Sequence, residues 1–159
     1  MDKKNDLSSW LPCSVVFVST AYGDERDIMT ATAMFISQKE PLLIISVAKD
    51  HLTEKLITQS GKFTVIIAGK EQGQLARQIG SIKGEEKNKF RYLSVNTTTS
   101  ELSDALIPEG AAAWMDCETE SFQEIKGYTL VIGRVVNQNE TGKPPLVWHR
   151  NTFFTLNPV

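Results

Sequence analysis

The sequence predicts a mainly β domain, an antiparallel, Greek-key-like β-barrel with two inserted helices. Three observations support this fold class. Short runs of β-branched and aromatic residues recur along the chain, as is typical of strands. Turns that contain Gly or Pro separate many of these runs. Two further segments show the apolar spacing of a helix.

Composition is that of an ordinary globular domain. The chain has 159 residues, of which 41% are hydrophobic and 23% charged, so one domain over residues 1–159 can bury a core. Residues 1–9 are polar, and we expect them to be flexible. A net charge of -2 argues against a nucleic-acid partner, and no apolar run is long enough to cross a membrane. Two cysteines and two histidines show no metal-ligand spacing, so we expect a cytoplasmic protein without metal.

Three strands are expected in the first third of the chain. Residues 15–18 form a β-branched and aromatic run that predicts a buried strand. Residues 28–37 alternate between two faces, and a turn at 22–25 joins them to the first strand as a hairpin. A third strand is expected over residues 42–47, after the turn that contains Pro41.

Two helices are expected next. The first begins at Thr53, whose hydroxyl can cap it, and ends at Gly61, which suits a left-handed position after a helix. The second covers residues 71–79 and is ended by Gly80. A charged loop at 81–89 follows.

The rest of the chain is rich in expected strands. These are residues 63–68, 111–118 and 128–136, with short strands near Val147 and Phe153. Between residues 90 and 107 we expect a short apolar segment at 90–95, no regular structure at 97–100, and one helical turn at 103–107.

Hydroxyl and basic side chains gather at the turn formed by residues 46–55. Ser46 and Thr53 can donate hydroxyl hydrogen bonds to an anion, and Lys49 and His51 can add charge-assisted ones. The helix that follows points its positive end at the same place. A phosphate ester is the natural ligand for such a turn. The alternative is a plain helix cap with solvated lysines.

A second candidate segment is the strand at residues 27–35, which is rich in small and hydroxyl residues. Small side chains let a planar ligand approach the backbone, and Thr30 and Thr32 can supply hydroxyls on one face. The alternative is that threonine simply suits a half-buried strand. Lys89 and Phe90 form a third candidate, a basic and aromatic pair that can neutralise a phosphate or cover a ring. The alternative is a solvated lysine beside a phenylalanine of the core.

Taken in order, these segments resemble the flavin reductase-like family, which has the FMN-binding split-barrel fold and includes flavoredoxin-like proteins. The similar motifs cover most of the chain: residues 15–20, 29–32, 40–42, 46 with 51–53, 60–63, 88–90, 117–118 and 132–135.

The resemblance implies an FMN site and its residues. Met29, Thr30, Ala31 and Thr32 are expected along the isoalloxazine ring. The residues expected around the ribityl chain and phosphate are Ser46, Val47, Ala48, Lys49, His51 and Thr53, with Lys89 and Phe90 closing the site. The family usually forms homodimers with FMN near the interface.

The resemblance also implies an oxidoreductase that transfers hydride from NADH or NADPH to flavin. Electrons would pass on to a small-molecule or protein acceptor. No catalytic side chain is expected, because the redox chemistry belongs to the cofactor.

Two departures from the family motifs leave alternatives open. Arg134 stands where the family has an acidic residue, and Gly127 and Tyr128 stand where many reductases have a histidine. An FMN-binding electron-transfer protein without its own NAD(P)H oxidation is therefore one alternative. A cofactor-free binding barrel is another.

Overall fold

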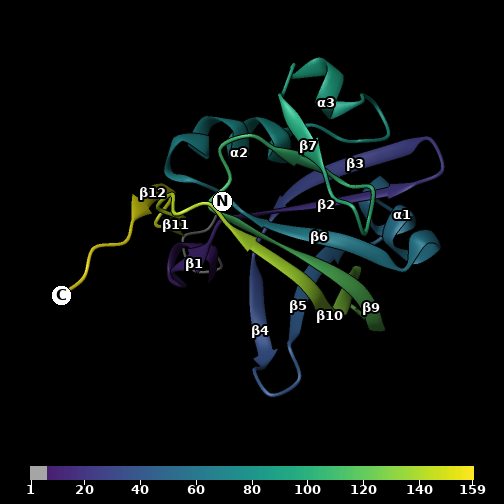
Figure 1. Ribbon diagram of the computed structural model, residues 1–159, viewed down its shortest axis with the longest axis horizontal. Coiled ribbons are helices and arrows are strands. Elements are labelled where there is room, and N and C mark those ends of the chain that lie inside the picture. Colours follow the sequence, from purple (N-terminus) through teal and green to yellow (C-terminus); the bar gives the residue numbers. More distant parts are fainter. Residues whose placement is uncertain (1–6) are drawn as a thin grey trace.

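Seven antiparallel strands form one curved sheet in the computed structural model, which describes residues 7–159 (Figure 1). In sheet order these strands are β3 (Glu25–Ala31), β2 (Val16–Tyr22), β6 (Lys62–Ile67), β9 (Ala113–Ile125), β10 (Tyr128–Glu140), β5 (Leu42–Ala48) and β4 (Ala33–Ser37). The mainly β, antiparallel fold class predicted from the sequence is confirmed.

The sheet curls because its two outermost strands are neighbours in the chain. β3 is at one edge of the sheet and β4 is at the other, yet only Thr32 separates them. The two edges must therefore meet at this residue, and the sheet closes into a barrel there. β4 pairs only with residues 42–45 of β5. Away from Thr32 the barrel therefore has a seam between β3 and the rest of β5.

Helices and short strands surround this barrel. The helical elements are η1 (Leu7–Ser9), α1 (Leu52–Ser60), η2 (Lys70–Gln72), α2 (Gly73–Ser81) and α3 (Lys89–Tyr92). A three-stranded sheet contains β1 (Cys13–Ser14), β11 (Leu146–His149) and β12 (Thr152–Thr155), and β7 (Thr97–Thr99) pairs with β8 (Leu106–Pro108). Within residues 7–159, no helix has the length and apolar character needed to cross a membrane.

β2 is buried on both faces and divides the core in two. Val16 and Val18 point into the barrel and pack with residues such as Ile57 of α1. Phe17 points the other way, toward a second cluster that contains Ile79 of α2. This two-sided burial explains why residues 15–18 form an unbroken apolar run.

Several element predictions need correction. His51, not Thr53, is the residue before α1, and its side chain makes no capping hydrogen bond. Gly61 does end α1 in the left-handed region, as expected. Gly80 does not end the second helix, because its backbone stays helical and α2 continues to Ser81.

Other corrections concern segments that the sequence left irregular or placed wrongly. Residues 89–92 form α3, capped by the Asn88 side chain. Residues 97–99 form β7 and 106–108 form β8, so the helical turn expected at 103–107 is wrong. The predicted strand at 28–37 is two strands that break at Thr32. The flexibility expected for residues 1–9 concerns mostly residues 1–6, outside the described part, whereas Leu7–Ser9 form η1.

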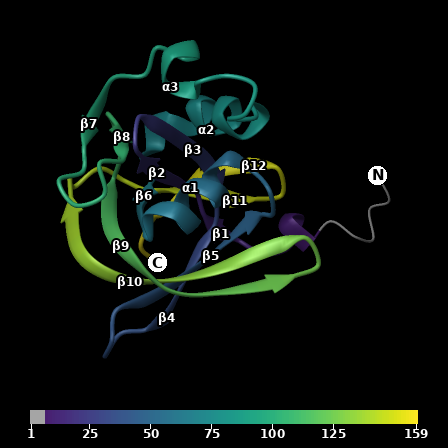
Figure 2. The same cartoon turned by 90° about the vertical axis from the view of Figure 1, so that its right-hand side faces the viewer.

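The long hairpin of β9 and β10 runs across one side of the barrel (Figure 2). Its register shifts between Ile132 and Gly133. At Gly133 an added Cβ would lie 2.4 Å from Cζ of Phe63 and 3.1 Å from Cβ of Cys117. Both neighbours are fully buried, so a glycine is required here by close approach.

We expect Gly133→Ala to lower the free energy of unfolding by about 1–3 kcal/mol, because the methyl group overpacks the barrel interior. Denaturant unfolding followed by circular dichroism measures this. Gly80→Ala is the matched control, because its added Cβ meets only Thr30, at 3.6 Å. That control is expected to be neutral or slightly stabilising, since alanine favours a helix. Equal stability of Gly133→Ala and the unmodified protein would contradict the packing argument.

Candidate functional site

A pocket of about 320 Å³ lies at the seam of the barrel, and we call it the polar pocket. Its walls come from β3, β5, the start of α1, the end of α2 and the segment that joins α2 to α3. Its lining residues are Asp27, Met29, Thr30, Ser46, Ala48, His51, Leu52, Thr53, Ile79, Gly80, Ser81, Ile82, Lys83, Gly84, Glu85, Lys89 and Tyr128.

The polar pocket brings together seven of the twelve residues predicted as cofactor ligands. These are Met29, Thr30, Ser46, Ala48, His51, Thr53 and Lys89. They come from three predicted segments that are far apart in the sequence. The fold therefore brings together the strand segment 27–35, the turn at residues 46–55 and Lys89.

A second pocket of about 280 Å³ adjoins the first, and we call it the apolar pocket. Thr30 and Gly80 line both pockets, so the two meet at these residues. Its lining residues are Cys13, Ser14, Val15, Thr30, Ala31, Thr32, Ala76, Arg77, Gly80, Trp148 and Phe153. The predicted ring residues Ala31 and Thr32 thus lie on the apolar side of the junction.

Three predicted side chains are not in either pocket. Val47 is fully buried in the barrel core, because alternate residues of β5 face opposite sides. Lys49 points to the β9–β10 hairpin, where its Nζ donates to Glu124 at 2.9 Å. Phe90 packs in the core cluster under α2. The side chains of Phe90 and Lys49 therefore face away from both pockets, and their roles at a ring and at a phosphate stay predictions.

Asp27, which the sequence analysis assigned no role, organises the polar pocket. Its carboxylate is 3% exposed. Thr53 donates its hydroxyl hydrogen to Oδ2 of Asp27 at 2.5 Å, and Nζ of Lys89 lies 3.2 Å from Oδ1. Lys89 also donates to the backbone carbonyl of Ile28 at 2.5 Å. An acidic residue directly before the apolar pair Ile28 and Met29 is the signal that could have indicated a buried partner.

A second carboxylate, that of Glu85, lies near the start of α1. It belongs to the segment between α2 and α3. Burial alone would raise the pKa of Glu85, but hydrogen bonds from the backbone N–H groups of Glu85 and Leu52 outweigh it. The nearby side chains of His51 and Lys55 act in the same direction, and the pKa of Glu85 is lowered. Glu85 thus interacts with one of the free N–H groups at the start of α1.

The family model described as "Flavin reductase like domain" matches residues 8–157 of the chain. The chain belongs to this family. The *Escherichia coli* protein YddH, described as uncharacterized, is 30% identical over 117 residues, which is 70% of this chain and 61% of YddH. The chain therefore spans less than two thirds of that relative.

Two further members of the flavin reductase-like family cover more of the chain. HsaB of *Mycobacterium tuberculosis*, the reductase subunit of a flavin-dependent monooxygenase, is 27% identical over 151 residues, or 92% of this chain and 78% of HsaB. The solved structure of SgcE6, an NADH:FAD oxidoreductase of *Streptomyces globisporus*, superposes with a TM-score of 0.84 at 24% identity. That match covers 93% of this chain and 88% of SgcE6 and supports the same fold.

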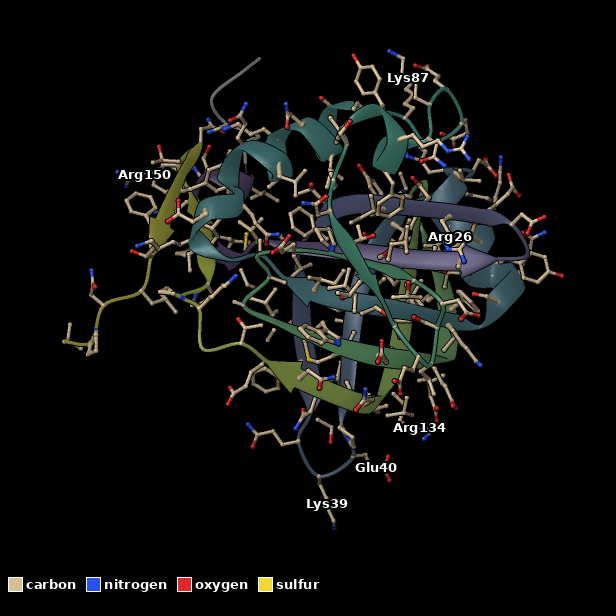
Figure 3. All side chains as sticks on the ribbon, turned by 45° about the horizontal axis from the view of Figure 1, so that its top comes forward. Arg26, Lys39, Glu40, Lys87, Arg134 and Arg150 are labelled. Atoms are coloured by element: carbon tan, nitrogen blue, oxygen red, sulfur yellow. The ribbon has the colours of Figure 1, made fainter. Side chains whose placement is uncertain are left out.

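The two departures from the family motifs have different consequences for the site. Arg134 is exposed and pairs with Glu118 at 2.9 Å and Glu120 at 3.6 Å. Figure 3 shows Arg134 far from Lys87. Lys87 belongs to the segment between α2 and α3, which lines part of the polar pocket. Arg134 therefore belongs to a surface ion pair on the hairpin. Tyr128, in contrast, lines the polar pocket, so this departure changes the site itself.

The two cysteines differ in their relation to the site. Burial raises the pKa of the Cys117 thiol to about 12, and the charge of Asp116 adds to the shift. Cys117 is fully buried and stays an unreactive thiol. Cys13 is partly exposed and lines the apolar pocket. Its pKa is also raised by burial, so it acts as an apolar wall residue.

We expect Thr53→Val to lower the free energy of unfolding by about 1.5–3 kcal/mol, because the Asp27 carboxylate loses a buried donor. Chemical denaturation measures this change. The matched control is Thr58→Val in the same helix, whose hydroxyl makes an exposed bond to a backbone carbonyl. The control is expected to change stability by less than about 0.5 kcal/mol. Equal effects of the two substitutions would show that the bond to Asp27 contributes nothing.

Proposed function

We propose that this protein is a flavin-dependent oxidoreductase that accepts hydride from NADH or NADPH. The observation that carries the proposal is the junction of an apolar and a polar pocket at Thr30 and Gly80. Most of the residues that the resemblance assigned to FMN lie along these two pockets. The family match over residues 8–157 supports the same activity.

The lining of the pockets fits the chemistry of a flavin. A flavin joins a planar, mostly apolar ring system to a polar ribityl chain. The apolar pocket offers the small residues Ala31 and Ala76 and the aromatic residues Trp148 and Phe153. The polar pocket offers hydroxyls and charged groups, among them Ser46 and Lys89. Binding sites of this kind combine an apolar lining with a few polar groups that fix orientation.

The aromatic wall of the apolar pocket is held in place by a cation. The rings of Trp148 and Phe153 meet edge to face, with centroids 5.1 Å apart. The guanidinium of Arg77 lies 5.2 Å from the first centroid and 4.8 Å from the second. Such cation–π contacts favour one arrangement of the side chains. This wall would orient a planar ligand and exclude water from one of its sides.

Thr30 has a positioning role at the junction of the two pockets. Its hydroxyl donates to the backbone carbonyl of Ala76 at 2.6 Å, which ties β3 to α2.

When bound, the flavin would supply the hydride-accepting chemistry, and the protein supplies binding and orientation. The names of two relatives agree with the proposed activity, because HsaB is a reductase subunit and SgcE6 is an NADH:FAD oxidoreductase. The acceptor of the electrons is, on this proposal, a free flavin or a partner protein.

An electron-transfer flavoprotein without its own NAD(P)H oxidation is the second candidate. Tyr128 favours it, because this residue lines the polar pocket where many reductases of the family carry a histidine. The two candidates share the flavin site and differ only in the reaction with NAD(P)H.

We also propose that the protein is cytoplasmic, because its two free cysteines suit a reducing compartment.

We expect the purified protein to bind flavin and to oxidise NADH or NADPH only when flavin is present. Visible absorption of the protein and loss of absorbance at the nicotinamide band measure the two properties. Flavin binding without oxidation of either nucleotide would favour the electron-transfer candidate. Failure to bind FMN, FAD and riboflavin would contradict both and revive the cofactor-free barrel.

Gly80→Leu tests whether the junction is the binding site. Its side chain would project into the space that both pockets share, and we expect flavin affinity to fall by about tenfold or more. Gln78→Leu, on the exposed side of α2, is the matched control and should leave affinity unchanged. Equal affinity in both variants would place the flavin elsewhere.

We also propose that the protein is a homodimer in which a second copy covers β4. This edge strand exposes Met34 at 65% and Phe35 at 68%, and it projects from the rest of the molecule (Figure 1). Met34 and Phe35 border a groove of about 370 Å³ that also contains Met115 and Val135. An apolar edge of this kind is typical of an interface between protein chains.

We expect a molecular mass of twice 17.7 kDa in light scattering, and a monomer for Phe35→Glu, because a buried carboxylate would oppose association. Phe154→Glu is the control, since Phe154 is exposed on β12 outside the groove. A monomeric unmodified protein, or a dimer that survives Phe35→Glu, would contradict the assignment of this face.

A further inference from the structure

Two of the groups predicted to bind a flavin phosphate, Thr53 and Lys89, are already engaged by a carboxylate of the chain itself. A hydroxyl has one hydrogen to donate, and Thr53 gives its hydrogen to Asp27. Lys89 has three donors, of which one faces the Ile28 carbonyl and another faces Asp27. The hydroxyl and the ammonium predicted to hold a phosphate therefore both face an internal anion.

Asp27 is held firmly in this position. It is 3% exposed, and its carboxylate packs against the backbone of Gly84 so closely that an added Cβ there would lie 2.6 Å from Oδ1. The backbone of the loop thus closes over the carboxylate. Movement of Asp27 away from Lys89 would leave a buried ammonium without its partner, which is strongly unfavourable.

The formal charges around the polar pocket cancel. Its lining contains two carboxylates, Asp27 and Glu85, and two ammonium groups, Lys83 and Lys89, with His51 counted as neutral. Glu85 lies close to the start of α1, where the backbone N–H of Leu52 contributes to lowering its pKa. A phosphate dianion placed here would find no excess positive charge and would lie close to a buried negative one.

We propose that Asp27 is a specificity-determining residue that removes most of the advantage of a phosphate group, so that riboflavin and FMN bind this protein with similar affinity. The inference rests on the proposed flavin site. Recognition then depends on the ring system in the apolar pocket and on neutral hydrogen bonds to the ribityl chain. The substrate class is the isoalloxazine with its ribityl chain, with or without the phosphate.

The test is a fluorescence titration of the protein with riboflavin and with FMN. For the unmodified protein we expect the two dissociation constants to differ by less than about threefold. A preference for FMN of about tenfold or more would overturn the proposal while leaving the flavin site intact. Binding of neither compound, nor of FAD, would instead overturn the proposed function and this inference with it.

Asp27→Asn supplies the second measurement. The amide keeps one acceptor oxygen for Lys89, and its NH2 group can donate to the Thr53 hydroxyl oxygen. Because the negative charge is removed, FMN affinity should rise by about tenfold with riboflavin affinity unchanged. Unchanged or weaker FMN binding would mean that Asp27 serves only to position Lys89. Asp24→Asn is the matched control, because it changes net charge equally in the exposed turn between β2 and β3. This control should not alter either affinity.

Glu85→Gln keeps the proposal testable if Asp27→Asn does not fold. Glu85 is exposed, so its substitution does not disturb the core. We expect the same selective gain for FMN, of about threefold, because solvent weakens the charge effect of an exposed group. A gain for riboflavin equal to that for FMN would contradict a charge-based mechanism.

Discussion

The seam of the barrel is the constraint from which the site follows. β3 and β4 occupy opposite edges of the sheet and are joined through Thr32 alone, so the edges can meet only at that residue. Beyond it, β3 and β5 diverge and the polar pocket opens between them. Helices α1 and α2 pack beside β3 and supply the remaining walls. The location of the site is thus a result of topology before any ligand is considered.

The buried ion pair at this seam gives the pocket its electrostatic character. An isolated buried ammonium or carboxylate would be very unfavourable, and Asp27 and Lys89 compensate each other with help from Thr53 and the Ile28 carbonyl. Such a pair adds little net stability compared with apolar residues of the same volume. Its main effect is to connect three elements, since Asp27 is in β3, Thr53 in α1 and Lys89 in α3.

Much of the fold was predictable because strand periodicity and turn residues are local. The buried run of β2, the hairpin to β3 and the left-handed Gly61 all follow from neighbouring residues. The pairing partners are not local. β7 is recognisable as a strand only beside β8, and the outer halves of β9 and β10 are polar and depend on each other. Local patterns therefore missed or shortened these strands.

The site was predictable in its segments but not in its contacts. Alternation along β5 explains why Ser46 and Ala48 reach the pocket while Val47 is buried. The choice of partner for a polar side chain depends on residues far away in the sequence. Thr53 looked like a helix cap because it precedes a helical pattern, yet it bonds to Asp27, 26 residues earlier. Lys49 looked like an anion ligand, yet it pairs with Glu124, 75 residues later.

The unequal burial of β2 and β3 has a consequence for local motion. Residues Val16 to Thr20 of β2 are fully shielded between β3 and β6, so their amide hydrogens should exchange with solvent only when the whole domain unfolds. β3 has a strand neighbour on one side only, and edge strands open at lower free energy. Transient fraying of the partly buried end of β3, residues 29–31, would widen the seam while Asp27 and β2 stay in place. This gives a bulky ligand a way in without global unfolding.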